Sequence, residues 1–186
     1  LVEKDAIVDG SRVEAGDAVL GLASSGVHSN GYSLVRRILE SGRLTTHDLF
    51  PLSERTVGED LLEPTRIYVK SVLRLLEAEV PIRAMAHVTG GGLAGNLGRV
   101  IPAGLSARLR LDSWKVPRLF RTLQELGSVS DAEMHRTFNM GVGYVLVVAR
   151  DSARHATQLL EQAGETVVQL GRVVRGDERV SLEGQA

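Results

Sequence analysis

The 186-residue chain has an ordinary globular composition, with 43% hydrophobic and 24% charged residues, and it is long enough for one substantial domain. Its 22 Lys and Arg residues balance 23 Asp and Glu residues, so its charge gives no reason to expect nucleic acid or an anionic membrane as a partner. The lack of cysteine excludes disulfides and thiolate metal sites, and no apolar run approaches the roughly 18 residues of a membrane helix.

The first ten residues predict two short extended pieces, at 1–4 and 6–10. The chain begins with Leu1 instead of Met, and we therefore expect it to be a piece of a longer protein. Apolar periodicity and turn signals predict the elements that follow. In chain order these are a strand at 17–23, a helix at 31–40, an irregular connection at 43–58, a long helix at 59–79 with Pro64 near its first turn and Pro81 at its end, and a strand at 82–88.

Strands and helices continue to interleave in the second half of the chain. Residues 105–111 alternate between apolar and polar types, which is typical of a half-buried strand. Ser130, with Glu133 three residues later, predicts the start of a helix. The expected helices lie at 93–100, 117–126, 131–137 and from a cap at Asp151 or Ser152 to 163, and the expected strands at 105–111, 144–149, 166–174 and 180–182.

The order of these elements restricts the fold class. It lacks a strict βαβ repeat, and it contains no internal repeat or low-complexity linker. It therefore favours a single α+β domain over residues 1–186, with a mixed β-sheet and flanking helices in an α/β/α layered sandwich, over a doubly wound Rossmann sheet.

A polar loop, 24–31, separates the first strong strand from the helix that follows it. In this order, backbone N–H groups and short hydroxyls lie where an anion can bind, and Gly26 and Gly31 let the backbone approach a ligand closely. His28 adds a group that titrates near neutral pH. The alternative is that Ser-Asn-Gly only forms a turn and a helix cap. We interpret the loop as half of a phosphate-binding site.

Two more glycine-rich loops are candidates. The loop 87–92, reading HVTGGG, lies between a strand and a helix, and successive N–H groups there suit a phosphate or an oxyanion. A flexible loop is the alternative, because this sequence matches neither a Walker A motif nor GxGxxG. In the loop 138–143, Asn139 offers a donor and an acceptor for an amide or base edge, whereas a strand entry with apolar core residues is the alternative. Arg66 is either a phosphate ligand or a surface ion-pair partner.

Four segments together resemble one family. GLASSGVHSNGYSLVRRIL, LLEPTRIYVKSVL, AMAHVTGGGLAGNLGRVIP and MHRTFNMGVG are similar to the C-terminal domain of phosphoribosylformylglycinamidine cyclo-ligase, also called aminoimidazole ribonucleotide synthetase. The resemblance covers essentially the whole chain in the right order, and four motifs in sequence make it specific. It implies that the family's N-terminal ATP-binding domain, with its acidic metal-binding motifs, is absent from this chain.

The resemblance implies the fifth step of purine biosynthesis. In that reaction ATP activates the formyl amide oxygen of formylglycinamidine ribonucleotide, and ring closure yields aminoimidazole ribonucleotide, ADP and phosphate. The implied cofactors are ATP and Mg²⁺, bound mainly by the N-terminal domain. The implied partners are the phosphorylated ribonucleotide, that N-terminal domain and a second copy of the full-length protein in the cytoplasm. The chain alone is expected to be inactive.

The family's active site lies in the cleft between the two domains, and this domain contributes glycine- and serine-rich loops to it. No residue is singled out as the general base; His28 is a better candidate than His87, and no metal ligand is expected in this domain. At the matching positions the resemblance implies a set of substrate or phosphate contacts. They are Ser24, Ser25, Gly26, His28, Ser29, Asn30, Thr89, Gly90, Gly91, Gly92 and Asn139.

Other ATP-dependent enzymes share this domain, namely formylglycinamidine synthase, selenophosphate synthetase, thiamine-phosphate kinase and a hydrogenase maturation factor. The combination of LLEPTRIYVKSVL with FNMGVG favours the cyclo-ligase over these relatives. The alternative from another class is a noncatalytic domain that binds phosphorylated metabolites or a protein partner.

Overall fold

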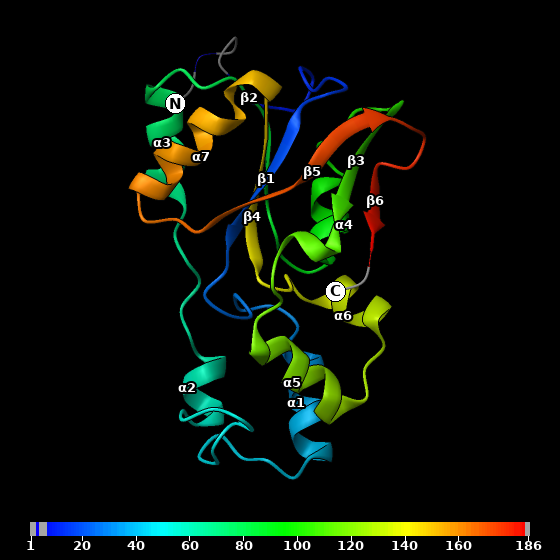
Figure 1. The fold of residues 1–186 in the computed structure, drawn as a ribbon. Coiled ribbons are helices and arrows are strands. Elements are labelled where there is room, and N and C mark those ends of the chain that lie inside the picture. The colour runs from blue at the N-terminus through cyan, green and yellow to red at the C-terminus, as the bar shows by residue number, and fades with distance from the viewer. Residues whose placement is uncertain (1–2, 4–6, 185–186) are drawn as a thin grey trace.

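The computed structural model describes residue 3 and residues 7–184, and it is organised around one six-stranded sheet (Figure 1). The strands are β1 (Ala18–Ala23), β2 (Ile82–His87), β3 (Leu105–Arg110), β4 (Val142–Val148), β5 (Val167–Arg175) and β6 (Val180–Glu183). Their order across the sheet is β2-β4-β1-β5-β3-β6. Neighbouring strands are antiparallel except for β3 and β6, which are parallel. The predicted mixed sheet is therefore confirmed.

Seven α-helices and two short 3₁₀ helices accompany the sheet in the described part of the chain. They are α1 (Tyr32–Ser41), α2 (Val57–Leu61), α3 (Val69–Glu77), α4 (Gly92–Leu97), α5 (Arg118–Gly127), α6 (Asp131–Thr137), α7 (Ala153–Gln162), η2 (Leu111–Ser113) and η3 (Arg150–Ser152). The bounds of α6 match the prediction because its start is set locally, by a hydrogen bond from the Glu133 N–H to the Ser130 hydroxyl. Within these residues, no helix combines the length and apolarity needed to cross a membrane.

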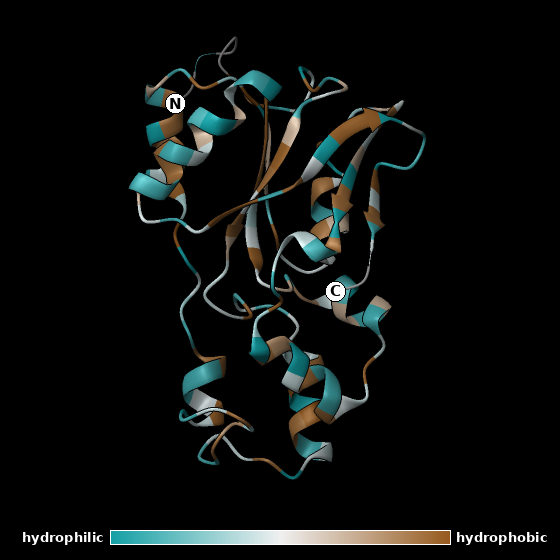
Figure 2. Cartoon of the chain, viewed as in Figure 1, coloured by the Kyte–Doolittle hydropathy of each residue, from teal (hydrophilic) through white to brown (hydrophobic). Residues whose placement is uncertain are grey.

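Both faces of β1 and β4 are buried, which explains the nearly continuous apolar sequence of these two strands. On β1, Val19 packs in the cluster that includes α4, whereas Leu20 and Leu22 pack in the cluster that includes α3 and α7. All three side chains are at most 1% exposed, and burying each contributes about 1.5–3 kcal/mol. Figure 2 shows the same pattern, since β1, β2 and β4 are mostly brown or white whereas α3 and α7 alternate between brown and teal.

A second group of helices packs beyond one end of the sheet (Figure 1). Elements α1, α2, α5 and α6 surround a third apolar cluster that includes Phe50, Phe120 and Phe138. The centroids of the Phe120 and Phe138 rings are 5.9 Å apart. Because α1 follows β1 through the loop 24–31, this loop lies at the junction between the sheet and the helical group.

The single helix predicted over 59–79 is wrong. The structure has α2, a non-helical segment at 62–68, and α3, which ends at Glu77, before Pro81. Pro64 lies in the non-helical segment because it lacks an N–H donor and disfavours helical geometry in the residue before it. This segment carries the chain from the helical group back to the sheet. The Tyr68 hydroxyl holds it there by donating a hydrogen bond of 2.8 Å to the carbonyl of Ala23.

The two extended pieces predicted in the first ten residues fall partly outside the described residues, which include residue 3 of the first piece and residues 7–10 of the second. Residues 7–9 belong to no strand, so the described part of the second piece does not join the sheet. Gly10 instead lies against the backbone of Val100, where a Cβ would be 2.2 Å from the carbonyl oxygen. The position therefore requires glycine.

Two leucines on α3 test this packing. Leu75 is fully buried against the sheet, whereas Leu73 on the same helix is 48% exposed. We expect Leu75→Ala to lower the free energy of unfolding by about 2–5 kcal/mol, because it leaves a cavity under the helix. Leu73→Ala should change that free energy by only about 0.5 kcal/mol. Urea denaturation followed by circular dichroism measures both, and equal losses for the two variants would contradict the observed position of α3.

Candidate functional site

Asn30 joins two polar loops that are far apart in the sequence. Its side-chain Oδ1 accepts a hydrogen bond of 3.0 Å from the N–H of Gly90, and its Nδ2 donates one of 2.6 Å to the carbonyl of His28. Strands β1 and β2 both pair antiparallel with β4 and are therefore parallel to each other. The loops that follow them consequently lie at the same end of the sheet. One asparagine thus connects the serine-rich loop 24–31 with the glycine-rich loop 88–92.

His28 holds the serine-rich loop from inside. The residue is 2% exposed, and its Nε2 accepts a hydrogen bond of 3.0 Å from the N–H of Ser25. The N–H of Arg66 approaches the same nitrogen at 3.4 Å. Burial, followed by the electrostatic influence of the neighbouring His87 and Arg66, lowers the pKa of His28 from 6.5 to about 4. The imidazole is therefore neutral at neutral pH, and its Nε2 serves as a fixed acceptor.

The His28 ring belongs to a group of four rings that also includes Tyr68, His87 and Tyr144. The centroids of neighbouring rings in this group are between 5.2 and 6.3 Å apart. Gly143 on β4 makes room for the group, since a Cβ there would lie 2.2 Å from the Tyr68 hydroxyl and 2.6 Å from His28 Cε1. Burial raises the pKa of Tyr68 and of Tyr144, so both phenols are neutral at physiological pH.

Asn139 supports the serine-rich loop from the third glycine-rich loop. It is 2% exposed, and its Nδ2 donates a hydrogen bond of 2.8 Å to the carbonyl of Gly26. Its Oδ1 accepts hydrogen bonds from the Ser24 hydroxyl at 2.9 Å and from the Gly141 N–H at 2.8 Å. Both ends of the amide are thus engaged inside the protein and shape the loop. The ligand contact expected for Asn139 stays a prediction.

The glycine-rich loop is a fixed turn. Asn96, which is 5% exposed, donates from Nδ2 to the carbonyl of Gly92 at 2.8 Å and accepts at Oδ1 from the Thr89 hydroxyl at 3.0 Å. Gly91 and Gly92 have φ angles of +100° and +65°, in the left-handed region that favours glycine. A Cβ on Gly92 would lie 1.8 Å from the carbonyl oxygen of His135. These constraints explain the consecutive glycines better than chain flexibility does.

Helix α1 begins without a side-chain cap, as α3, α4, α5 and α7 also do. Its N-cap residue, Gly31, has a φ of +75° and offers no side-chain hydrogen bond, and the first turn carries no acidic residue. By contrast, the side chains of Thr56 and Ser130 cap α2 and α6, whose first turns carry acidic residues. The first N–H groups of α1 therefore receive no acceptor from a cap side chain. Such groups at a helix N-terminus favour a bound anion.

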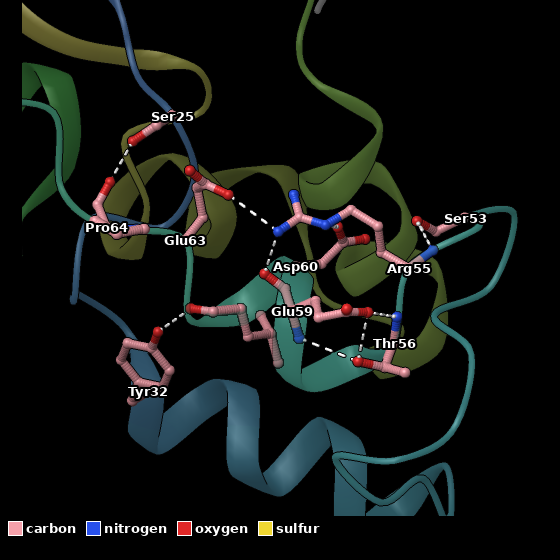
Figure 3. A network of polar contacts seen from close by, with 10 residues as sticks. Ser25, Tyr32, Ser53, Arg55, Thr56, Glu59, Asp60, Glu63 and Pro64 are labelled. Atoms are coloured by element: carbon pink, nitrogen blue, oxygen red, sulfur yellow. Dashed lines mark hydrogen bonds and ion pairs between the residues drawn. The ribbon is translucent and has the colours of Figure 1, made fainter.

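A polar network positions the chain after α2 against the serine-rich loop (Figure 3). Arg55 donates to the carbonyl of Glu59 at 2.7 Å and to the carboxylate of Glu63 at 3.0 Å. The Ser25 hydroxyl then donates to the carbonyl of Pro64 at 2.7 Å. Because exposed ion pairs contribute only about 0–1 kcal/mol each, the network matters more for the position of residues 63–66 than for stability.

An open apolar cavity of about 420 Å³ lies beside the ring group. Tyr68, His87 and Tyr144 line it, together with Ile67 and Val69, which are 79% and 60% exposed. Apolar side chains exposed together in this way mark an interaction surface. The cavity therefore extends the candidate site from the polar loops onto an apolar surface.

The chemistry of the two loops suits an anion. They present hydroxyls and backbone N–H groups, which donate hydrogen bonds. Within residue 3 and residues 7–184, no group of three or more His, Asp or Glu side chains could hold a metal ion. Arg66, the candidate phosphate ligand, instead forms an ion pair of 3.2 Å with Glu165, which is the alternative that the sequence left open.

The structure brings the predicted site residues together but divides them into two kinds. Exposed or half-buried members that a ligand can reach are Ser25, Ser29, Asn30, Thr89, Gly90 and Gly91. The buried members are Gly26, His28, Gly92 and Asn139, and the half-buried Ser24 donates its hydroxyl hydrogen to Asn139. Sequence reasoning missed Asn96, Tyr68, Gly143 and Tyr144. Asn96 could have been found from the sequence, because it is a polar residue at a position of a short helix where the apolar periodicity predicts an apolar residue.

Residues 14–183 match the family model described as AIR synthase related protein, C-terminal domain. A relative from Pseudothermotoga lettingae, named phosphoribosylformylglycinamidine cyclo-ligase, is 45% identical over 182 residues, which make up 98% of this chain and 53% of the relative. The chain spans about half the length of the curated relatives that it matches. The resemblance that the four sequence segments indicate is confirmed.

Solved structures share the fold at low sequence identity. Thiamine-monophosphate kinase from Stenotrophomonas maltophilia K279a has a TM-score of 0.64 at 19% identity, covering 100% of this chain and 55% of the kinase. Hydrogenase maturation protein HypE in complex with ATP has a TM-score of 0.64 at 18% identity, covering 98% of this chain and 51% of HypE. These similarities confirm the predicted fold class.

The depressed pKa of His28 leads to a prediction about stability. Because the folded pKa of about 4 lies below the ordinary value of 6.5, the unfolded chain binds the proton first as the pH falls. The contribution of neutral His28 to stability is therefore complete above about pH 6.5 and is lost as the pH falls toward 4. In His28→Gln the amide oxygen replaces Nε2 as acceptor without titrating. We expect its free energy of unfolding to fall less steeply than that of the wild type across this range.

Urea denaturation at several pH values measures these free energies, and NMR of the imidazole nitrogens measures the pKa directly. The matched variant His28→Phe removes the acceptor for Ser25 and should be less stable than His28→Gln at pH 7. An imidazole that titrates near 6.5 in the folded protein would contradict the assignment.

Proposed function

The chain belongs to the family of the AIR synthase related protein C-terminal domain, and we propose that it forms one side of the active site of a phosphoribosylformylglycinamidine cyclo-ligase. The observation that carries the proposal is the hydrogen bond between Asn30 and the Gly90 N–H. It holds a serine-rich and a glycine-rich loop together at one edge of the sheet. There the exposed members of both loops face solvent and are accessible to a ligand.

In the proposed reaction this edge binds the phosphorylated ribonucleotide. Activation of the amide oxygen and ring closure both place negative charge on oxygen atoms, and preorganised N–H donors stabilise such charge without reorganising. The N–H groups at the uncapped start of α1 and of Gly91 are donors of this kind, whereas the Gly90 N–H is held by Asn30. The exposed hydroxyl of Ser29 adds a donor that orients the substrate, whereas the Ser25 hydroxyl already donates to the carbonyl of Pro64.

His28 has a positioning role in this proposal. Its neutral ring holds the Ser25 N–H, and its carbonyl accepts the hydrogen bond from Asn30 that aligns the second loop. With a pKa of about 4, the ring is a weak base at neutral pH. The proton lost in ring closure is therefore taken up by a group other than His28 Nε2.

When bound, ATP supplies the phosphoryl group that activates the amide oxygen. The loops of this chain fit a phosphate, whereas the described residues offer no carboxylate cluster for Mg²⁺. We therefore assign the metal ligands and most of the ATP contacts to the other half of a full-length relative. The apolar cavity with Ile67 and Val69 is the surface that this half covers. We also propose that the full-length protein forms homodimers in the cytoplasm.

Sequence identity favours this activity over others that use the same fold. The cyclo-ligase from Pseudothermotoga lettingae is 45% identical to the chain, whereas the thiamine-monophosphate kinase is 19% identical. A noncatalytic domain that binds a phosphorylated metabolite shares the loops but predicts no turnover. Activity measurements on the full-length protein therefore separate the two functions.

Asn30→Ala in the full-length protein tests the role of the hydrogen bond between Asn30 and the Gly90 N–H. Without Oδ1 the Gly90 N–H loses its acceptor, and we expect the KM for formylglycinamidine ribonucleotide to rise about tenfold, as the loss of one hydrogen bond near a charged ligand predicts. ADP release at varied substrate concentration measures this effect. Ser41→Ala, at the exposed last residue of α1, is the control and should keep the wild-type KM. Wild-type kinetics in a folded Asn30→Ala variant would count against the site.

The 186-residue chain by itself should release no ADP from ATP in the presence of formylglycinamidine ribonucleotide. The reason is that the proposed metal ligands and most ATP contacts lie in the other half of the full-length protein. The same assay, run with the full-length protein as the positive control, measures this outcome. Turnover by the chain alone would show that the proposed division of the active site is incorrect.

A further inference from the structure

A groove lined by arginines lies away from the two loops. Two adjoining cavities of about 680 and 610 Å³ share Gln169 and Arg172 as lining residues. The first cavity also contains Gly16 and Ala18, at the start of β1, whereas the serine-rich loop follows the end of β1. The groove is therefore separate from the candidate active site.

The groove exists because helices cover only part of one sheet face. Helix α7 packs through Ala156 and Leu160 onto the cluster that contains Leu20. The side of η3 and α7 next to this packed face lines the groove. Its residues recur at intervals of three and four, as one helix face requires, and are Arg150, Ala153, Arg154, Thr157, Gln158 and Glu161.

Small residues on the strands keep the groove open. Ala18 is the register partner of Arg172 across β1 and β5, and its methyl group leaves space beside the longer side chain. Gly171 lines the groove without a side chain, and a Cβ there would lie 1.9 Å from the carbonyl oxygen of Arg108. The close approach of the β3 backbone thus requires a glycine in this part of the groove.

The groove carries an excess of positive charge. Its lining includes five arginines and two glutamates, although the whole chain has a net charge of −1. Arg108 pairs with Glu183 at 3.0 Å, and Arg110 pairs with Asp112 at 3.1 Å. Among residues 7–184, the structure shows no ion pair for Arg150, Arg154 or Arg172. Three guanidinium groups therefore remain available to a ligand.

These arginines come in two like-charged pairs, one on each side of the groove. Arg108 and Arg172 are register partners on adjacent antiparallel strands, a position that puts Cβ atoms about 4.5–5.5 Å apart. Arg150 and Arg154 are four residues apart along η3 and α7, a spacing that puts Cβ atoms about 5–6 Å apart on a helix. Like charges at either spacing destabilise the folded chain. Glu183 offsets the charge of Arg108, whereas within the described residues no carboxylate pairs with Arg150, Arg154 or Arg172.

We propose that this groove binds an anion with two linked phosphate groups, either free diphosphate or the diphosphate of a nucleotide. One phosphate group binds at the arginine pair on the sheet and the other at the pair on α7, because the guanidinium fork matches phosphate oxygens in a bidentate manner. Arg172 and Arg154 contribute the free charge from the two sides. Gln169 and Thr157 line the same groove and donate hydrogen bonds to the remaining oxygens.

Calorimetric titration of the 186-residue chain with pyrophosphate, ADP and inorganic phosphate tests the proposal. We expect pyrophosphate or ADP to bind with one-to-one stoichiometry and more tightly than inorganic phosphate. Arg154→Gln and Arg172→Gln should each weaken this binding by about tenfold or more, as the loss of a charge-assisted hydrogen bond predicts. Both side chains are exposed, and circular dichroism confirms that each variant is folded.

Two matched variants separate this groove from other sources of binding. Arg121→Gln removes an exposed arginine on α5, outside the groove, and should leave the affinity unchanged. Asn30→Ala disrupts the loop site and should also leave it unchanged. Equal affinity for pyrophosphate and ADP identifies free diphosphate as the ligand, whereas tighter binding of ADP identifies a nucleotide.

Three results would overturn the proposal. The first is no preference for pyrophosphate or ADP over inorganic phosphate. The second is binding that Asn30→Ala weakens and the two groove variants do not, which would place the anion at the loops. The third is an equal loss for Arg121→Gln and the groove variants, which would indicate nonspecific attraction to positive charge.

Discussion

The ring of His28 lies over Gly143, where a side chain on β4 would collide with it and with the Tyr68 hydroxyl. This close approach lets the His28 imidazole be buried, and burial lowers its pKa so that the ring is neutral at neutral pH. The neutral ring then holds Ser25, and the backbone of His28 holds Asn30, which in turn holds Gly90. A single glycine in a central strand is thus the condition for the arrangement of both loops at the edge of the sheet.

The second loop also combines a glycine that makes room for a neighbour with a buried polar side chain, which here is an amide. Gly92 lies against the backbone of His135, and Asn96 satisfies the carbonyls of the turn. Asn139 does the same for Gly26. Buried amides with partners at both ends fix the loops without a charge, and this leaves the N–H groups at the start of α1 for a ligand. Rigid loops of this kind suit a reaction that depends on positioning and electrostatic stabilisation.

The near-neutral net charge of the chain conceals a strong local asymmetry. Three kinds of surface lie on different parts of the same sheet: polar loops at the end of β1 and β2, an apolar cavity beside α3, and an arginine-lined groove between α7 and the outer strands. They arise because the helices cover the sheet incompletely. Helices α3 and α7 lie together over one part of it, and α1, α2, α5 and α6 pack beyond its end (Figure 1).

The amino-acid sequence determined most elements and the family, because those features are local. The strand at β1, the cap that starts α6 and the three glycine-rich loops all rest on neighbouring residues, and four segments sufficed to indicate the family. Tertiary structure decided what depends on distant partners. It placed the segment 62–68, which Pro64 keeps out of a helix, against the end of β1 and the serine-rich loop. It made His28 neutral and brought Arg108 beside Arg172, since burial and strand register join residues that no sequence spacing relates.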